Sequence, residues 1–474
     1  MISELSIKRP VTTVMFVLIV IILGVVSLTN LKQDLMPQMD LGIAIVMTGF
    51  DGAGPEEVEN LVTVPLENVL NTVSNLKNMT STSSNGSSMI VLEFMDGTDM
   101  DSAALKIRES IDLVSSMLPD ASDPRVLQID PSMMDQLIIG VTGQDMDLAS
   151  LKNILDDEVI NRLEKLEGVG SVTASGGLER EIGIELMPDK LNSYNVNGSQ
   201  IAALLAAENI NLPGGRLNQG EFELQVRTTG EFQSVEEIEN LPITTPRGSV
   251  IHLRDVALVT DGFKTATSYS LVNGLQGISL SISKQSSANT VEVADRVLAE
   301  IDVLRAEFPD LDIITIMDNS SFIKSSVNNV WQTVIQATVL AALVLLIFLG
   351  SIRGSLIIGA AIPISIITTM GLMYFSDITL NMVTLNALVI SVGMLVDNSI
   401  VVLESISRHL QAGKEPKAAA ADGAKEVGLS VMASTLTTVV VFVPVLFTSG
   451  IAGVMFGQLG LILTFSLLAS LVVS

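Results

Sequence analysis

The stretch MVTLNALVISVGMLVDNSIVVLESI, residues 382–406, is apolar over a length that can cross a bilayer, yet it carries Asp397 near its middle. A helix needs about 20 residues to span about 30 Å of hydrocarbon. A carboxylate at the bilayer centre costs roughly 2.5 to 3.5 kcal/mol even on the gentler insertion scale, so it indicates a function. Helical periodicity places Asn386, Gly393 and Glu404 on the same face as Asp397. We therefore predict a polar stripe that faces into a helix bundle.

Asp397 is the candidate proton carrier of this stripe. Burial disfavours the charged form of a carboxyl group and a nearby cation favours it, so such a group can gain and lose a proton. Asn398 has nearly the same shape but cannot titrate, and serves at most as a hydrogen-bond partner. Gly393 would let a neighbouring helix approach closely. Two other interpretations stay open: a neutral structural role for Asp397, and an interfacial ion pair between Glu404 and Arg408.

Five further apolar runs predict a membrane protein with six helices. They are residues 11–28, 330–349, 356–375, 430–447 and 459–474. The chain of 474 residues is 48% hydrophobic and only 16% charged, which is too apolar for an ordinary soluble protein. The first run lacks a small-residue cleavage site, so we expect an uncleaved helix. The last run reaches Ser474 without a polar flank, which suggests a fragment of a longer protein.

Most of the charge lies between the first and second runs. Residues 29–326 hold 45 of the 52 acidic and 19 of the 26 basic residues, so the whole net charge of −26 lies there. Lys8, Arg9, Arg353 and the basic segment 407–428 all fall on one side if the N-terminus is cytoplasmic, as the positive-inside rule requires. We expect a multi-pass protein of the cytoplasmic (inner) membrane with its large loop external.

The external block predicts two similar α+β units. Residues 41–119 show a strand, a helix, two strands around an Asn-Gly turn and a second helix, and the same order begins again after Gln136. We expect a β-α-β-β-α-β arrangement in each unit, with residues 169–186 as two strands around Gly176-Gly177. A helix, a Gly-rich hairpin and a closing strand at 250–259 would be inserted into the second unit.

Several classes of protein are excluded by composition and motifs. There is no cysteine, which excludes disulfides and Cys-ligated metals. The acidic block argues against a nucleic-acid partner, which needs a basic face. Nucleotide-binding, metalloprotease and hydrolase motifs are absent, so we expect neither an enzyme nor a cofactor. His252, His409 and the pair Met133-Met134 are interpreted as structural residues, and no metal site is predicted.

Several segments closely resemble one known family. They are SIKRPVTTVMFVLIVIILG (6–24), FDGAGPEEVENLVTVPLENVL (50–70), LEGVGSVTASGG (166–177), VIHLRDVA (250–257) and GMLVDNSIVVLESI (393–406). The chain resembles, in colinear order from Ser6 to Ser474, the N-terminal half of the AcrB-like resistance-nodulation-cell division (RND) exporters of the hydrophobe/amphiphile efflux branch.

The resemblance implies a six-helix transmembrane bundle with a large external α+β porter and docking domain between its first two helices. Expected divisions are a first helix (1–30), porter subdomain 1 (31–132), porter subdomain 2 (133–189 and 264–322), a docking insertion (190–263) and helices two to six (323–474). The hairpin with Gly214, Gly215 and Gly220 would be the arm that reaches into a neighbouring subunit of a homotrimer.

The resemblance also implies a proton relay. Asp397 matches the first of two adjacent aspartates found in many members, and Asn398 stands where the second would be. The family's lysine partner belongs to a second half that this chain lacks. Asp135 and Ser175 stand where drug pumps have pocket phenylalanines, so this half does not support an aromatic drug pocket.

These observations predict a subunit of a proton-driven RND multidrug efflux permease that exports hydrophobic or amphiphilic compounds. Its partners would be the second half, further copies in a homotrimer, a periplasmic adaptor, an outer-membrane channel, the lipid bilayer and a small amphiphilic substrate. The alternatives are a heavy-metal RND exporter, a non-transporting assembly or translocation factor, and an inactive truncated fragment. Loss of gradient-driven flux in Asp397→Asn would separate an exporter from a non-transporting factor.

Overall fold

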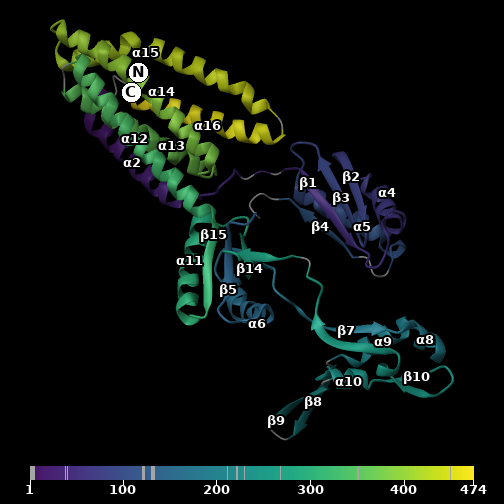
Figure 1. Ribbon diagram of the computed structural model, residues 1–474. Coiled ribbons are helices and arrows are strands. Elements are labelled where there is room, and N and C mark those ends of the chain that lie inside the picture. The colour runs from purple at the N-terminus through teal and green to yellow at the C-terminus, as the bar shows by residue number, and fades with distance from the viewer. Residues whose placement is uncertain are drawn as a thin grey trace.

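The computed structural model describes residues 6–474 apart from positions 38, 40, 120–122, 130–133, 211, 220, 221, 229, 267, 350, 351 and 449. Long helices form a bundle at one end of the molecule, and the units that contain strands extend from it (Figure 1). The strand-containing units lie in the sequence between the first and second helices of the bundle.

Six helices in the described part of the chain are long and apolar enough to cross a membrane. They are α2 (Pro10–Asn30), α12 (Asn319–Leu349), α13 (Ile352–Phe375), α14 (Met382–Gln411), α15 (Pro416–Phe442) and α16 (Gly450–Val473). The six predicted runs are thus confirmed as helices. α15 begins well before the predicted residue 430, because Pro416 suits the first helical turn and the polar residues after it continue the helix. Only residues 412–415 remain of the predicted loop 407–428.

The bundle has a core of its own, formed by side chains of α12, α13, α14 and α16. α2 lies against α13, and a Cβ added at Gly24 would be 2.3 Å from Ile367 Cγ2 and 2.6 Å from the Ile367 carbonyl oxygen. Glycine is needed here because two helix backbones approach closely. The outer faces of the helices expose many large apolar side chains, as expected of surfaces that meet lipid or other helices.

The first α+β unit is a four-stranded antiparallel sheet with helices on one face. Its elements are β1 (Ile43–Gly49), α3 (Pro55–Val58), η1 (Glu59–Thr63), α4 (Val64–Leu70), β2 (Leu76–Ser84), β3 (Ser87–Phe94), α5 (Met100–Val114) and β4 (Pro124–Gln128). The strand order is β2-β3-β1-β4. The predicted hairpin is confirmed, with Gly86 at a φ of +72° in its turn.

The second α+β unit repeats this topology. Its elements are β5 (Leu137–Gly143), α6 (Leu148–Ile154), η4 (Leu155–Ile160), α7 (Asn161–Glu164), β6 (Val169–Ser175), β14 (Leu275–Lys284), α11 (Thr290–Glu307) and β15 (Leu311–Asp318). The order β6-β14-β5-β15 corresponds strand for strand to that of the first unit, and η1 and η4 are π-helical turns at matching places. The predicted repeat is therefore confirmed. A short strand, β13 (Ser270–Val272), also pairs with β14.

The two strands predicted around Gly176-Gly177 are confirmed, but their expected placement as the two middle strands of the second unit is wrong. β6 pairs with β14, whereas β7 (Arg180–Leu186) pairs with β12 (Ala257–Phe263). Pairing with β14 places Val172 opposite Ile282 and buries both in the core of the second unit, which the half-exposed β7 could not do. The strand pairing therefore groups residues 180–186 with the insertion. This insertion enters where the first unit has its Asn-Gly turn.

The rest of the insertion is built from short elements around a separate core. They are α8 (Pro188–Tyr194), α9 (Gly198–Glu208), β8 (Leu212–Gln219), β9 (Phe222–Thr228), α10 (Val235–Glu239), β10 (Pro242–Thr244) and β11 (Val250–His252). The predicted continuous strand at 250–259 is wrong, because a 3-10 turn, η5 (Leu253–Asp255), separates β11 from β12. The Asp255 carboxylate accepts a hydrogen bond from the His252 backbone at 2.9 Å and closes this turn.

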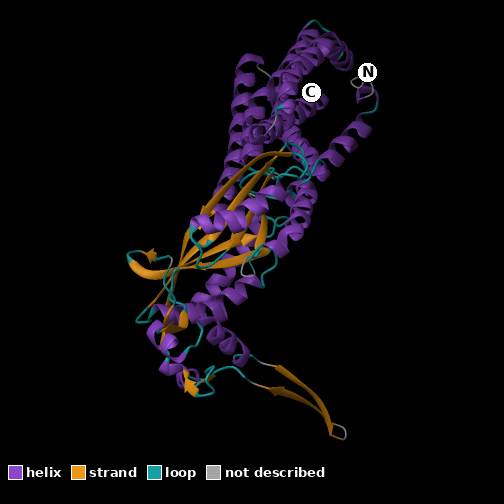
Figure 2. Cartoon of the chain, turned by 90° about the vertical axis from the view of Figure 1, so that its right-hand side faces the viewer, coloured by secondary structure: helices purple, strands orange, loops and turns teal. Residues whose placement is uncertain are grey.

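The β8–β9 hairpin projects far from the other elements (Figure 2). Its register shifts between Pro213 and Arg216, so Gly214 and Gly215 lie at an irregularity of the ladder. Gly220 lies outside the described residues. The role of the hairpin as an intersubunit arm stays a prediction.

Candidate functional site

α14, the helix that carries Asp397, has a firmly fixed start. The Asn381 side-chain oxygen accepts hydrogen bonds from the backbone of Val383 and Thr384, both at 3.0 Å. Its amide nitrogen donates to Gln458 of α16 at 3.0 Å. This N-cap satisfies backbone donors that the first helical turn leaves unpaired, and it ties the start of α14 to a second helix.

The two faces of α14 have different surroundings. Leu388, Val392 and Leu395 lie in the bundle core. The residues of the predicted polar stripe are all exposed in the described chain: Asn386, Gly393, Asp397 and Glu404. The stripe therefore lies on the face of α14 that the helices of this chain leave open.

Asp397 makes no hydrogen bond or ion pair with any described residue. A Cβ added at Gly393 would meet nothing within 4 Å, and Asn386 donates only to the Met382 carbonyl of its own helix, at 2.8 Å. No described helix of this chain makes the expected close approach at Gly393. The stripe as a surface buried in a larger bundle stays a prediction.

Asn398 faces a different neighbour from Asp397. It is 9% exposed, and its side-chain nitrogen donates to Thr435 Oγ1 of α15 at 3.2 Å. Successive residues on a helix point about 100° apart, so the adjacent carboxylate and amide lie on different faces. Asn398 thus joins two helices, and no described bond connects it to Asp397.

The expected ion pair between Glu404 and Arg408 is wrong. Arg408 bonds Glu426 of α15 at 2.6 Å, and His409 bonds the same carboxylate at 2.8 Å. The short connection at 412–415 folds α15 back along α14, which brings Glu426 within reach. These contacts hold the end of the α14–α15 hairpin and leave Glu404 on the open stripe.

The sheet of the second unit has an uncharged, hydroxyl-bearing face on β6 and β14. Three cross-strand pairs make it up: Ser171 with Ser283, Thr173 with Ser281 and Ser175 with Ser279. The Ser171 and Ser283 hydroxyls lie 2.8 Å apart, and Ser175 donates to Ser268 at 3.3 Å. Helices α6 and α11 contribute to the core on the other side. Asp135 lies outside this sheet, and its carbonyl accepts a hydrogen bond from Asn319 at 3.1 Å.

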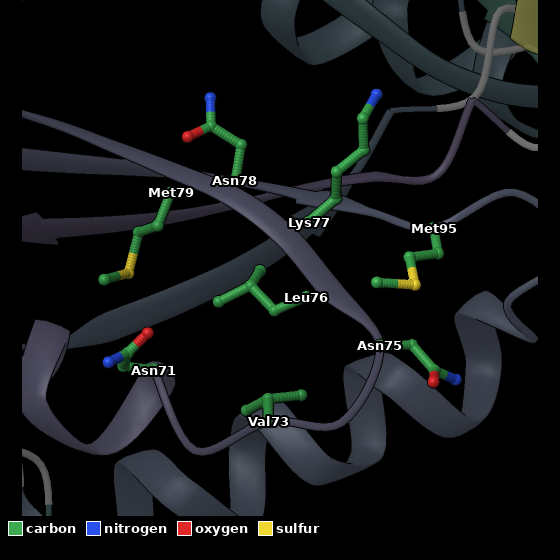
Figure 3. A pocket seen from close by; sticks show the side chains of 8 residues that line it. All are labelled: Asn71, Val73, Asn75, Leu76, Lys77, Asn78, Met79 and Met95. Carbon is green, nitrogen blue, oxygen red and sulfur yellow. The ribbon is translucent and has the colours of Figure 1, made fainter.

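An open depression of about 440 Å³ lies in the first unit, at the start of β2 (Figure 3). Amide, apolar and methionine side chains line it together with Lys77, whose ammonium group bonds Glu93 at 2.7 Å. None of the predicted site residues belongs to it.

The described fold, with its six apolar helices and its repeated α+β units, agrees with comparison to known proteins. Residues 2–474 match the AcrB/AcrD/AcrF family. The chain belongs to the AcrB/AcrD/AcrF family. Members of this RND family are multidrug efflux transporters and not enzymes. Together with the six apolar helices, this family membership indicates that the chain is part of a multi-pass membrane protein.

Two curated relatives show how much of a whole transporter is present. The multidrug resistance protein MdtC of Yersinia pestis bv. Antiqua (strain Angola) is 33% identical over 473 residues, which cover 99% of this chain and 46% of the relative. MdtC of Yersinia pseudotuberculosis serotype O:1b (strain IP 31758) gives the same identity and coverage. The chain spans about half the length of these relatives.

Sequence reasoning missed one buried polar cluster, around Asp34, Lys284 and Thr290. A signal for it exists in β14, where inward-facing Ile278, Leu280 and Ile282 are followed at the same spacing by a lysine. A lysine on the buried side of a strand needs a partner. Its partner is distant in sequence, which is why periodicity alone did not find it.

Proposed function

We propose that this chain is the N-terminal half of a proton-driven permease that exports hydrophobic or amphiphilic compounds across the inner membrane. The observation that carries the proposal is Asp397, a carboxylate without a partner among the described residues, on the open face of a long apolar helix. Family membership supports the efflux function. In this proposal Asp397 takes up and releases a proton as the transporter changes conformation.

The exposed stripe on α14 allows a helix from another part of the transporter to pack against the Asp397 carboxylate. A charge on this face costs several kcal/mol in hydrocarbon, and a facing cation would offset that cost. One elementary charge that moves across 100 mV supplies about 2.3 kcal/mol, which can drive a conformational step. The cation would come from the second half of the transporter.

The two α+β units would be the porter subdomains and the insertion the docking subdomain, all outside the membrane. Lys8 and Arg9 then lie on the cytoplasmic side, together with the basic α14–α15 connection. The β8–β9 hairpin would be the arm between subunits of a homotrimer. A periplasmic adaptor and an outer-membrane channel would complete the assembly.

The hydroxyl-bearing face of the second unit supports an amphiphilic cargo. Its six Ser and Thr side chains offer hydrogen bonds without charge, and the face lacks aromatic rings on which a flat drug would stack. Compounds that combine polar uncharged groups with an apolar part fit this chemistry best.

The test is Asp397→Asn in the whole transporter, purified from its native membrane and placed in liposomes. With an imposed pH gradient, efflux of an amphiphilic dye should fall to the level of empty liposomes, because asparagine cannot carry the proton. Asp377→Asn is the matched control. Asp377 is an exposed aspartate between α13 and α14 with a φ of +53°, which asparagine also tolerates, so this variant should transport normally.

The alternatives give different results. A non-transporting assembly factor would show no gradient-driven flux in the wild type and no effect of Asp397→Asn. A heavy-metal exporter would transport metal ions and not the dye. Either result would overturn the proposal.

A further inference from the structure

The segment that follows α2 is bonded to the start of α14. The Leu380 backbone donates to Lys32 O at 2.9 Å, and the Asp34 backbone donates to Leu380 O at 3.0 Å. Met382 N, in the first turn of α14, donates to Leu35 O at 3.2 Å. Residues 32–35 therefore run alongside the residues at the start of α14, and Gln33 and Leu380 form a parallel β-bridge.

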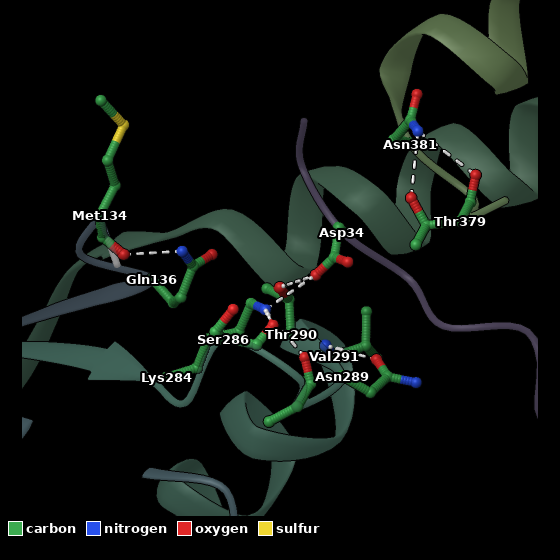
Figure 4. A network of polar contacts seen from close by, with 11 residues as sticks. Asp34, Met134, Gln136, Lys284, Ser286, Asn289, Thr290, Val291, Thr379 and Asn381 are labelled. Carbon is green, nitrogen blue, oxygen red and sulfur yellow. Dashed lines mark hydrogen bonds and ion pairs between the residues drawn. The ribbon is translucent and has the colours of Figure 1, made fainter. Parts of the chain in front are cut away.

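The same segment is bonded to the second α+β unit. Thr290 N, at the start of α11, donates to Gln33 O at 3.1 Å, and Thr290 Oγ1 donates to Asp34 Oδ1 at 2.9 Å. Lys284 Nζ, at the end of β14, lies 3.2 Å from the same carboxylate oxygen. Figure 4 shows the three side chains converging, with Asn381 and Thr379 on the neighbouring part of the chain.

The ion pair is almost completely buried. The side chains of Lys284 and Asp34 are 2% and 7% exposed. Lys284 also donates to the carbonyl oxygens of Ser286 at 3.3 Å and Ala288 at 2.8 Å, so its three donors are all used. Asp34 Oδ2 has no partner among the described residues. A buried pair of this kind is seldom a net source of stability, but its geometry is specific and breaking it is costly.

We propose that Asp34 and Lys284 form a joint that positions the second α+β unit relative to α14. The inference rests on the proposed function, because α14 carries the proton carboxylate Asp397. From Asn381 to Asp397 the helix runs about 24 Å at about 1.5 Å per residue, and its intact backbone moves as one piece. A shift of α14 on protonation therefore reaches residues 32–35, and through Asp34 it reaches the ends of β14 and α11.

The first test is the double variant Asp34→Asn/Lys284→Met in the reconstituted whole transporter. It removes both charges, so neither is left buried alone. We expect proton-driven efflux to fall about tenfold or more. Dye binding and labelling of Asp397 by a carbodiimide should stay at wild-type levels. Normal efflux in this variant would overturn the proposal.

The matched control is Asp295→Asn/Lys324→Met. This ion pair also joins the second unit to the bundle, from α11 to α12, but both of its side chains are about half exposed. It should transport like the wild type, since an exposed pair contributes little. Equal losses in the two double variants would show that any bridging pair matters, which contradicts a specific joint.

A covalent replacement keeps the proposal testable if the double variant folds poorly. These 474 residues hold no cysteine, so Asp34→Cys/Thr290→Cys in the Lys284→Met background introduces a single possible disulfide within them. The joint predicts efflux when the cross-link is oxidised and loss when it is reduced. Equal efflux in the two states, or none in either, would overturn the proposal.

The control for the underlying function is Asp397→Asn. If that variant transports normally, the proposed proton role fails. If Asp397→Asn is inactive while Asp34→Asn/Lys284→Met and the cysteine variant both transport normally, only the proposed joint fails.

Discussion

Asn398 and Asp397 are adjacent in sequence but have different neighbours. Asn398 is buried and bonds Thr435 of α15, whereas Asp397 is exposed on the open stripe. We therefore expect Asn398→Ala to lower the stability of the helix bundle by about 1 kcal/mol, the net worth of a hydrogen bond, and to leave proton coupling intact. Thermal unfolding in detergent and dye efflux measure the two effects. Loss of coupling at normal stability would assign Asn398 to the relay after all.

Gly24 is the residue where α2 meets α13. An added side chain would collide with the Ile367 backbone, which cannot move aside as a flexible side chain can. Gly24→Leu should destabilise the bundle by about 1 to 3 kcal/mol, the usual cost of overpacking. Gly428→Leu on α15 is the control, because a Cβ there meets nothing within 4 Å. The melting temperatures of the two variants measure this difference. Similar decreases in both variants would contradict a close approach of α2 and α13 at Gly24.

At the scale of elements, the β7–β12 ladder gives a pH dependence. Arg180 donates two hydrogen bonds to the Asp261 carboxylate, at 2.9 and 2.7 Å, and these hold the pKa of Asp261 below its ordinary value. Because the pKa is lower in the folded state, the stabilisation is present above the ordinary value of 3.8 and is lost as the pH falls through the folded pKa.

Asp261→Asn should therefore lower the urea midpoint of the insertion at about pH 7, and the difference from the wild type should shrink as the pH falls below the ordinary pKa of 3.8. Arg180→Met should give the same pattern, since it removes the other partner. A difference between wild type and variants that persists unchanged at low pH would contradict this assignment.

The two α+β units show how one topology accepts an insertion. β2 and β3 are joined by an Asn-Gly turn, whereas the matching strands β6 and β14 are separated by the whole insertion. The sheet order is unchanged because strand pairing depends on the buried faces and not on the length of the connection.

At the scale of the whole molecule, residues 32–35 contact both the start of α14 and the second unit. The joint and the proton carboxylate are thus connected through one continuous helix, and the Asp34 and Lys284 experiments test that connection. The chain spans about half the length of its curated relatives. The polar stripe of α14 is exposed on the surface of the described bundle.

The sequence by itself determined the six membrane helices and the repetition of an α+β unit, because hydropathy and strand–turn patterns are local properties. It also placed Asp397 on a shared face with Asn386 and Glu404. Only the tertiary structure decided that β6 pairs with β14, that Arg408 turns to Glu426, and that Asp34 meets Lys284. Each of these contacts joins residues that are distant in the chain, and local patterns do not indicate which partner the packing of helices and strands brings within reach.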